Sequence, residues 1–583
     1  MIRKISFQNY KAFEKGEIKL KPITILLGAN SVGKSSVINL ILTLQQTANS
    51  TNYKSALRLH GENVSMGECK NIFRNQDISK NLTIDIEFEN DKLKYLLREE
   101  LFNQLINQIT QPFQYYFHFS DISSNKQKND IKSVFNKRGE IDIKTKEDFI
   151  NLITNIEKLN KDIAKTANKQ SDDRIAYFLR KNTNTINEKE TVKLLYDFLS
   201  ETKKIEENIF SWSFELCYVT LDNIDCRKKE EEENILKINR LSLTNKGKQV
   251  INIKLVLSKN KTEYNDIIVT SDFINKEEIL DKKAKEEFLK MINYNSTIFS
   301  WAPRISKNRD FLFRDINDVE NSILTQTISQ IIEQSITSIK SRFTRELVNH
   351  VSPLRAHPKR YYFLDKANIN TVLDTFDGNS LTEILKENEK VKNQVNKWLK
   401  TFGLLHVDVS TLQDVIHKLK IKQYSLDLDI TDVGFGISQI LPIIVQGFWS
   451  EENSLTMIEQ PEIHLHPKMQ ADLADLFIDI VGINTEKSLF DVRQSELPKK
   501  CLIIETHSEY LLKRLRRRIS EGKISAQDIA IYFIEPPKNK NISAKIEEIK
   551  ISEEGAFDWP QDFYEGELKK DNTNFIKQLF SQK

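Results

Sequence analysis

The feature that most constrains this chain is a segment near its N-terminus, GANSVGKS, at residues 28–35. It matches the phosphate-binding loop (P-loop) pattern G-x-x-x-x-G-K-[ST] at every fixed position. An apolar segment at 23–27 precedes it, and a helix-like apolar segment at 36–44 follows it. The sequence therefore predicts strand, loop and helix in succession, in an α/β fold with a nucleotide site at this turn.

The residue types of this loop suit the phosphates of a nucleotide. Glycines let backbone N–H groups turn inward at a helix N-terminus, where the helix dipole favours anions. We expect Lys34 to neutralise the β- and γ-phosphates of ATP and the Ser35 hydroxyl to bind Mg²⁺. The expected nucleotide-contacting residues of the loop are Gly28, Ala29, Asn30, Ser31, Val32, Gly33, Lys34, Ser35 and Ser36.

Length and composition limit the class of protein. At 583 residues the chain is longer than one ordinary domain, and its 39% hydrophobic content excludes wholesale disorder. The formal net charge is +3, so any nucleic-acid contact must come from a local patch. The four cysteines form no CxxC pair, and the sequence has neither a signal-peptide core nor an apolar run of transmembrane length. We therefore expect a cytoplasmic protein without membrane contact.

Three regions differ in their sequence patterns. Residues 1–90 carry short strand and turn signals around the P-loop. Residues 91–345 are polar with helical periodicity, and strand-like alternation interrupts them at about 212–272. Residues 346–583 return to short apolar strands separated by helical segments. We expect a head formed by the first and third regions, with a large, mainly helical insertion that contains a small β element.

Within the insertion, periodicity predicts helices over 91–109, 144–165 and 319–351. The aromatic segment FQYYFHF at 113–119 fits a stacking surface or a core strand, and its density of rings favours the core strand.

A P-loop site also needs a carboxylate for Mg²⁺, and the sequence offers one on a distant strand. The segment Leu455–Glu459 is apolar and ends in an acid, and QPEIHLHP follows it. Before it, DVGFGISQ at 432–439 forms a glycine- and serine-rich turn that leads into an apolar helical segment. After it, a short apolar strand at 502–504 is followed by ETHS.

This order of motifs resembles the ABC-type ATPase heads of the SMC and RecF superfamily. More narrowly, IEQPEIHLHP, VGFGISQILP and ETHSEYLL resemble bacterial ATPases related to the overcoming-lysogenisation-defect (OLD) family. The segments SPLRAHPKRYY and EEGAFDWPQDFYEGEL are also similar to those chains. The resemblance covers residues 1–90 and 345–583 and does not extend to 91–345.

The resemblance implies a dimer of heads with two ATP molecules held between them. Ser438 would contact the γ-phosphate bound by the P-loop of a second subunit. Glu459 would bind Mg²⁺, and His507 would be the switch histidine near the γ-phosphate. Either Gln45 or Gln46 would take the Q-loop role.

One position departs from the family pattern. Hydrolytic ABC-type heads usually have a glutamate after the magnesium-binding acid, whereas here that residue is Gln460, which lacks a basic carboxylate. Glu462 could activate water instead if the turn at Pro461 brings it round. The expected catalytic residues are therefore Glu459, Gln460, Glu462 and His507. If Glu462 does not take over the role of the missing glutamate, hydrolysis is slow and ATP binding itself is the signal.

Three other segments admit more than one interpretation. The pair of histidines at 464–466 is a weak metal motif, and we favour no metal there. The basic run at 513–518 fits either DNA phosphates or pairing with nearby acids, and we favour the pairing. Arg355, Lys359 and Arg360 could contact a nucleotide, contact a partner or stabilise a turn, and the sequence favours none of these roles over the others.

The leading hypothesis is an ABC-type ATPase that uses ATP and Mg²⁺, dimerises around ATP, and acts as sensor, clamp or regulator in bacterial anti-phage defence or DNA maintenance. Self-association, a separate effector protein and DNA are the expected partners. No D-x-D pair follows His507, so we expect no Toprim nuclease domain. The alternatives are a hydrolysis-deficient ATP-bound scaffold that restrains a toxic partner, and a self-contained ATP-dependent nuclease with its active site within 91–345.

Overall fold

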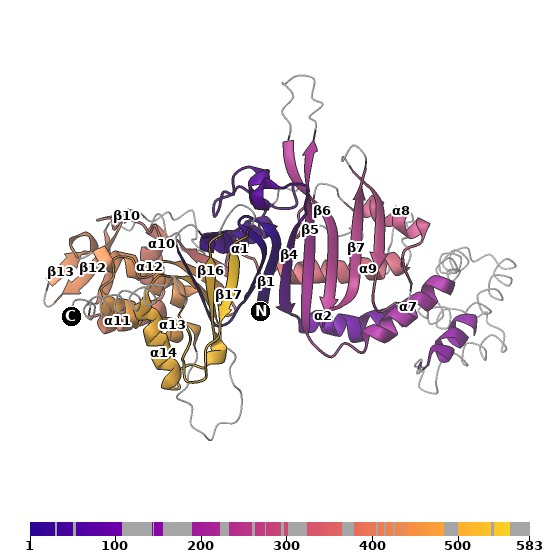
Figure 1. The fold of residues 1–583 in the computed structure, drawn as a ribbon. Coiled ribbons are helices and arrows are strands. Elements are labelled where there is room, and N and C mark those ends of the chain that lie inside the picture. The colour runs from indigo at the N-terminus through magenta and orange to yellow at the C-terminus, as the bar shows by residue number, and fades with distance from the viewer. Residues whose placement is uncertain are drawn as a thin grey trace, which may run out of the picture. The chain divides into compact units, whose positions relative to one another are not determined.

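The fold is that of a computed structural model, in which the chain forms two compact units (Figure 1). The first comprises Met1–Asn52, Leu57–Ile86 and Lys340–Lys583, and the second comprises Tyr53–Ala56 and Glu87–Ile339. The residues that the structure describes are 1–29, 32–50, 54–107, 143, 145–155, 189–221, 233–258, 263–274, 276–292, 296–300, 323–363, 378–403, 406–412, 416–423, 426–433, 435–482, 500–537 and 542–559.

A six-stranded sheet organises the first unit. Its strands, in spatial order, are β17 (Lys545–Ile549), β16 (Ile529–Glu535), β3 (Ile23–Gly28), β15 (Cys501–Glu505), β14 (Leu455–Glu459) and β9 (Val348–Val351). The pairs from β16 to β9 are parallel, whereas β17 is antiparallel to β16. Strands β3, β14 and β15 are buried along their whole length, which explains their continuous apolar sequences. The carboxyl ends of these parallel strands therefore meet at one edge of the sheet.

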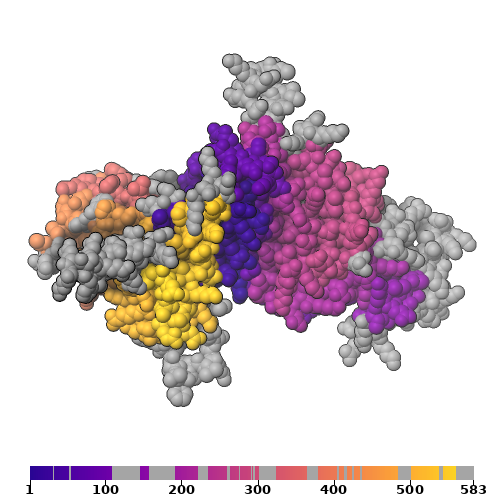
Figure 2. Space-filling view, in the orientation of Figure 1, coloured from indigo at the N-terminus to yellow at the C-terminus, as the bar shows by residue number. Residues whose placement is uncertain are grey.

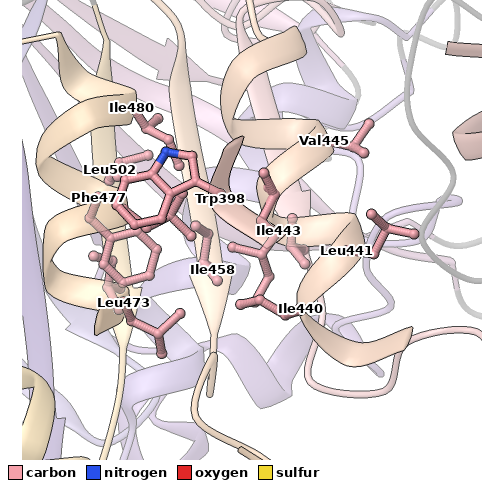
Figure 3. Packing of buried hydrophobic residues seen from close by; sticks show 14 of the residues in the cluster. Trp398, Ile440, Leu441, Ile443, Val445, Ile458, Leu473, Phe477, Ile480 and Leu502 are labelled. Atoms are coloured by element: carbon pink, nitrogen blue, oxygen red, sulfur yellow. The ribbon is translucent and has the colours of Figure 1, made fainter. Parts of the chain in front are cut away.

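Helices that pack on this sheet or on one another complete its core. They are α1 (Lys34–Ala48), α10 (Asn379–Glu387), α11 (Glu389–Thr401), α12 (Phe435–Trp449), α13 (Pro467–Val481) and α14 (Glu509–Ser520). Figure 3 shows Ile458 of β14 among side chains of three helices, including Trp398 of α11, Ile443 of α12 and Phe477 of α13. Burying one such side chain stabilises the fold by about 1.5–3 kcal/mol. This cluster holds the strands rigidly, so their carboxyl ends can present side chains in fixed positions.

Smaller elements of the first unit flank the sheet. Strands β1 (Ile2–Tyr10) and β2 (Phe13–Lys19) form an antiparallel hairpin, and β4 (Leu82–Glu89) leads the chain to the second unit. A second sheet contains β10 (Tyr362–Phe363), β12 (Ile416–Gln423) and β11 (Val407–Leu412), with β13 (Leu426–Asp429) paired to β12. Short 3-10 helices lie at Cys69–Ile72, Arg74–Gln76, Ile430–Asp432 and Ala526–Asp528.

The second unit contains four strands that pair in succession, each antiparallel to the one before (Figure 1). They are β5 (Ile209–Leu221), β6 (Glu233–Asn245), β7 (Lys248–Leu257) and β8 (Tyr264–Thr270), and they lie within the magenta surface of Figure 2. The helices of this unit are α2 (Asp91–Tyr95), a π-helix at Leu96–Glu100, α7 (Lys189–Thr202), α8 (Lys282–Met291) and α9 (Ile323–Lys340). Residues 146–155 are also helical.

The structure differs from the sequence analysis in two details of this region. The β element runs from Ile209 to Thr270, so it begins slightly before the expected residue 212 and ends within the expected range. The helix expected over 319–351 ends at Lys340, and Val348–Val351 forms β9 instead, because these residues pair with β14. The segment 113–119 lies outside the described residues. In the described part of the chain, no helix is long and apolar enough to cross a membrane.

Candidate nucleotide site

The P-loop connects β3 to α1, as the sequence predicts. Gly28 and Gly33 have φ of +145° and +113°, and Gly33 is the N-cap of α1. A Cβ at Gly28 would lie 2.6 Å from the carbonyl oxygen of Ile534, and one at Gly33 would lie 2.8 Å from the ring of Phe13. Both positions therefore need glycine. Asn30 and Ser31 lie outside the described residues, whereas Ala29, Val32 and Ser36 lie in the loop and first turn as expected.

Lys34 is buried at the first turn of α1, with 3% of its surface exposed. Its Nζ donates to the carbonyl oxygens of Gly28, at 3.0 Å, and Ala29, at 2.7 Å. It also lies 3.7 Å from Oε1 of Glu505, at the end of β15. Burial lowers the pKa of the Lys34 ammonium, and the nearby carboxylates, Glu505 foremost, oppose that shift. The ammonium is thus held inside the loop that would surround the phosphates.

Glu505 and Glu459 stand side by side at the carboxyl ends of β15 and β14, where the strand register pairs them. Ser35 Oγ donates to Oε2 of Glu505 at 3.2 Å, which joins the P-loop to this acidic edge. Burial raises the pKa of Glu505 to about 7; Lys34 opposes the shift, and the neighbouring Glu459 adds to it. Glu459 is 9% exposed, and its Oε1 lies 2.7 Å from Nε2 of His350 on β9.

A cavity of about 710 Å³ opens at this edge of the sheet. Lys34, Ser35, Gln460 and Glu505 line it on the side of the parallel strands. Its remaining walls come from the P-loop and from two segments near the N-terminus: Lys11, Ala12, Gly33, Ser36, Asn71, Phe73, Asn75 and Gln76. Five of the residues expected at the site thus lie around one cavity of nucleotide size, together with Glu505, which the sequence analysis did not predict there.

Gln460 lies in a strained turn directly after β14. Its φ is +44°, a left-handed conformation that costs a residue with a side chain about 1–2 kcal/mol. Its N–H donates to the carbonyl oxygen of Glu505 at 2.7 Å, so the turn is tied to β15. Since Gln460 also lines the cavity, strain is stored at the position where the family pattern has a catalytic glutamate.

Glu462 points toward the segment after β15 and is not among the residues that line the cavity. Its Oε1 accepts from the N–H of His507 at 2.6 Å, and its Oε2 accepts from Oγ1 of Thr506 at 2.8 Å. Burial raises the pKa of Glu462, and hydrogen bonds and Arg355 oppose the shift. Glu462 therefore links the turn after β14 to the segment after β15, and both of its carboxylate oxygens accept hydrogen bonds.

His507 follows β15 and lies near enough to Lys34 for the charge of the lysine to act on its imidazole. Burial lowers its pKa, and the charge of Lys34 adds to that shift, so the neutral imidazole is favoured. Its Nε2 is buried and has no hydrogen-bond partner among the described residues. A buried polar atom of this kind is costly unless a ligand or water satisfies it.

Three further predicted residues lie away from the cavity. Ser438 is 6% exposed in the first turns of α12, where it lines a separate cavity of about 20 Å³. Gln45 and Gln46 are also buried, and their Nε2 atoms donate to the backbone oxygens of Val348 and Arg58, each at 2.5 Å. Among the described residues, these two glutamines hold backbone in place and do not line the P-loop cavity.

The basic run of α14 pairs with acids, as we favoured. Arg514 Nη1 lies 3.1 Å from Asp472 and 2.6 Å from Asp475, both on α13, and Arg518 also pairs with Asp475. Arg517 lies 2.6 Å from Glu521. These contacts use the cationic groups to fasten α14 to α13 and to its own C-terminus, which leaves fewer of them for DNA.

The chemistry of this edge fits a magnesium nucleotide. Magnesium in such sites takes one or two carboxylates together with a hydroxyl and phosphate oxygens, and Glu459, Glu505 and Ser35 provide the protein groups. The unsatisfied Nε2 of His507 and the buried ammonium of Lys34 suit an anionic, polar ligand. Within the described ranges, this edge included, no three His, Cys, Asp or Glu side chains gather to hold a metal ion by themselves.

The raised pKa of Glu505 predicts that the stability of the folded protein depends on pH. The folded-state pKa of about 7 exceeds the ordinary value of 4.5, so the folded state binds more protons between these pH values, and stability falls as pH rises through them. Glu505→Gln, which mimics the protonated acid, is expected to stabilise the nucleotide-free protein by about 3 kcal/mol at pH 8 and by little near pH 4.5. Urea unfolding in EDTA at both pH values checks this, and a destabilised variant at pH 8 would contradict it.

The architecture and the site define a P-loop nucleotide-binding protein. A family model described as an AAA ATPase domain matches residues 1–220 and 175–512, more than half of the chain. The chain therefore belongs to this family of AAA ATPase domains, which confirms the α/β P-loop ATPase expected from the sequence. No curated protein matches the chain.

Solved structures with similar folds come from SMC proteins. The SMC head domain from Thermotoga maritima is 7% identical, with a TM-score of 0.33, covering 94% of this chain and 99% of that one. An SMC head bound to the C-winged helix domain of ScpA is 9% identical, with a TM-score of 0.31 and coverages of 94% and 98%. A third, an SMC head with an extended coiled coil bound to the C-terminal domain of ScpA derived from Pyrococcus furiosus, is 8% identical, with a TM-score of 0.29 and coverages of 94% and 96%.

Proposed function

We propose that this chain binds ATP with Mg²⁺ at the P-loop cavity and hydrolyses it. The observation that carries the proposal is the contact between Ser35 and Glu505, beside Lys34 and Glu459, at the carboxyl ends of adjacent parallel strands. A nucleotide-binding loop, the hydroxyl of Ser35 and the carboxylate of Glu505 thus line one open cavity, and Glu459 stands beside Glu505 at the same edge of the sheet. Membership in the AAA ATPase domain family supports the same activity.

Some residues of the site bind the nucleotide and the metal, and others act in hydrolysis. Magnesium–ATP, when bound, supplies the phosphoanhydride bond that is cleaved, and the metal partly neutralises the negative charge of the phosphate oxygens. Lys34 and the N–H groups at the start of α1 hold the phosphates, while Ser35 and Glu459 hold the metal. Gln460 orients the attacking water through its amide but cannot take its proton, so we expect slow turnover. His507 donates a hydrogen bond to an oxygen of the terminal phosphate from its Nε2, which has no partner among the described residues.

We further propose that two heads pair around ATP. None of the described residues that line the P-loop cavity comes from α12, which carries the signature motif. The order of the motifs along the chain supports a site completed by α12 of a second copy. Since Ser438 is itself buried, the first turn of α12 would contact that nucleotide through backbone N–H groups, or after Ser438 turns outward.

ATP-driven pairing gives such a chain a means to signal. We propose that the paired state acts as sensor or clamp for a separate effector protein or for DNA, in anti-phage defence or DNA maintenance. The resemblance of the motifs to OLD-related ATPases supports this role. Gln460 favours a second candidate, an ATP-locked scaffold that restrains a toxic partner, because an amide at this position prolongs the ATP-bound state.

Light scattering during gel filtration tests the pairing. In the presence of magnesium and a non-hydrolysable ATP analogue, we expect the mass to rise from 68.1 kDa to twice that value. Without nucleotide, and in Lys34→Ala with nucleotide, the mass is expected to stay at that of one chain. Nucleotide binding by the wild type with no change in mass would remove the pairing proposal and leave ATP binding intact.

A further inference from the structure

Arg355 lies in the segment after β9 and reaches the turn that follows β14. Only 6% of its surface is exposed. Its Nη2 donates to the carbonyl oxygen of Glu459 at 2.7 Å and to that of Gln460 at 3.3 Å. One guanidinium nitrogen therefore holds two consecutive carbonyl groups, those of the expected magnesium ligand and of the cavity-lining glutamine.

These two carbonyls bracket the strained residue. The carbonyl of Glu459 belongs to the peptide before the α-carbon of Gln460, and the carbonyl of Gln460 belongs to the peptide after it. Holding both therefore restricts rotation about the backbone bonds of Gln460, whose φ is +44°. A left-handed conformation at a residue with a side chain persists only where the surroundings impose it. Arg355 supplies that constraint from one side, and the hydrogen bond from Gln460 N–H to Glu505 supplies it from the other.

The placement of Arg355 is poor for stability alone. Burial lowers the pKa of its guanidinium to about 10, and the charges of Glu462 and Glu459 only partly oppose this. Its Nε and Nη1 are buried without a hydrogen-bond partner among the described residues. A buried cation with two unsatisfied nitrogens is a costly way to support a fold. The hydrogen bonds that its Nη2 makes around Gln460 instead point to a role at the site.

We propose that Arg355 is a positioning residue of the ATPase site. By holding the carbonyl groups on both sides of Gln460, it fixes the direction of the Glu459 carboxylate and of the Gln460 amide. It acts through the backbone of these residues and contacts neither nucleotide nor metal. This inference rests on the proposed function of the P-loop cavity.

Substitutions at Arg355 test the inference, because a positioning role predicts a change in kcat with little change in the affinity for ATP. In Arg355→Met, kcat for ATP hydrolysis is expected to fall by about 10- to 100-fold, as when a residue that orients a metal ligand is lost. The KM for ATP is expected to change less than about threefold, because Lys34 and Ser35 are untouched. Arg355→Lys keeps one cationic donor for the Glu459 carbonyl and is expected to recover part of the lost rate, with kcat still at least about threefold below that of the wild type.

Arg360→Met is the matched control. Arg360 lies in the same segment, but its side chain is 61% exposed and pairs with Asp432 at 3.2 Å. This control is expected to keep kcat within about twofold of wild type, since an exposed ion pair contributes little. The melting temperature of each variant is measured alongside.

Specific results would overturn the inference. A folded Arg355→Met protein with wild-type kcat would do so, as would equal losses of kcat, ATP affinity and melting temperature that Arg355→Lys does not restore. If Arg355→Met fails to fold, Arg355→Lys decides: reduced kcat at unchanged KM supports positioning, and unchanged kcat refutes it.

A second readout separates this inference from the proposed function. If the wild type shows no turnover above Lys34→Ala, the hydrolysis proposal fails by itself. The affinity for a fluorescent ATP analogue, with magnesium and with EDTA, then reports on Glu459. The gain in affinity from magnesium is expected to shrink about tenfold in Arg355→Met. An unchanged gain would refute the role of Arg355.

Discussion

ATP turnover and ATP binding are both expected to disappear in Lys34→Ala. The ammonium of Lys34 is 3% exposed and is held by the carbonyls of Gly28 and Ala29, so it stands inside the loop that would receive the phosphates. Its removal leaves the phosphate charge unneutralised beside the Glu505 carboxylate. We expect a loss of at least about 10²-fold in both affinity and rate, measured by equilibrium binding and steady-state hydrolysis with magnesium.

A matched variant separates this effect from a general loss of positive charge. Lys19 on β2 is exposed and pairs with Glu548 at 3.3 Å, and Lys19→Ala is expected to bind and hydrolyse ATP like the wild type. If Lys34→Ala retained wild-type affinity for ATP, the assignment of this loop as the phosphate site would be wrong.

Restoring a carboxylate after β14 is expected to accelerate hydrolysis. In Gln460→Glu, the new carboxylate would face the cavity from the position of the present amide and could accept the proton of the attacking water. We expect kcat to rise by about 10²-fold, the lower end of what a general base contributes. Steady-state assays from pH 6 to pH 9 measure it, because Glu459 and Glu505 next to the new acid would raise its pKa.

Gln460→Asn is the control for this gain. Asparagine keeps the amide and tolerates a left-handed φ such as the +44° found here, so the turn is expected to persist without acceleration. No rise in kcat for Gln460→Glu, in a variant that still binds ATP, would refute the view that the amide limits hydrolysis. The ATP-locked scaffold would then be the better description.

The parts of the site that the sequence predicts are those with a local signature. The P-loop is one continuous segment between a buried strand and a helix, and the structure places β3, the glycines and α1 accordingly. The positions of Glu459 and His507 are also predictable, because Glu459 ends one short, mainly apolar strand and His507 closely follows another. The roles assigned to the individual site residues remain predictions.

The parts that the sequence analysis missed depend on which strands become neighbours. Glu505 ends a strand just as Glu459 does, and that similarity was the available signal, but only the parallel pairing of β3 with β15 brings it to Ser35. His350 reaches Glu459 because β9 pairs with β14, in a segment whose periodicity indicated a helix. The cavity walls at residues 71–76 carry no recognisable motif.

The strand order of the head also has a consequence for biosynthesis. The neighbours of β3 in the sheet are β15 and β16, and more than four hundred residues separate β3 from them in the sequence. At about 5–20 residues per second, a ribosome needs roughly 20 to 100 s to make that interval. During this time β3, which is buried along its whole length in the folded head, has emerged from the ribosome with both of its edges unpaired. Such a strand can pair with other chains and aggregate. Shielding of the nascent N-terminal segment, by a chaperone or by its own hairpin, is therefore a requirement for producing this ATPase in soluble form.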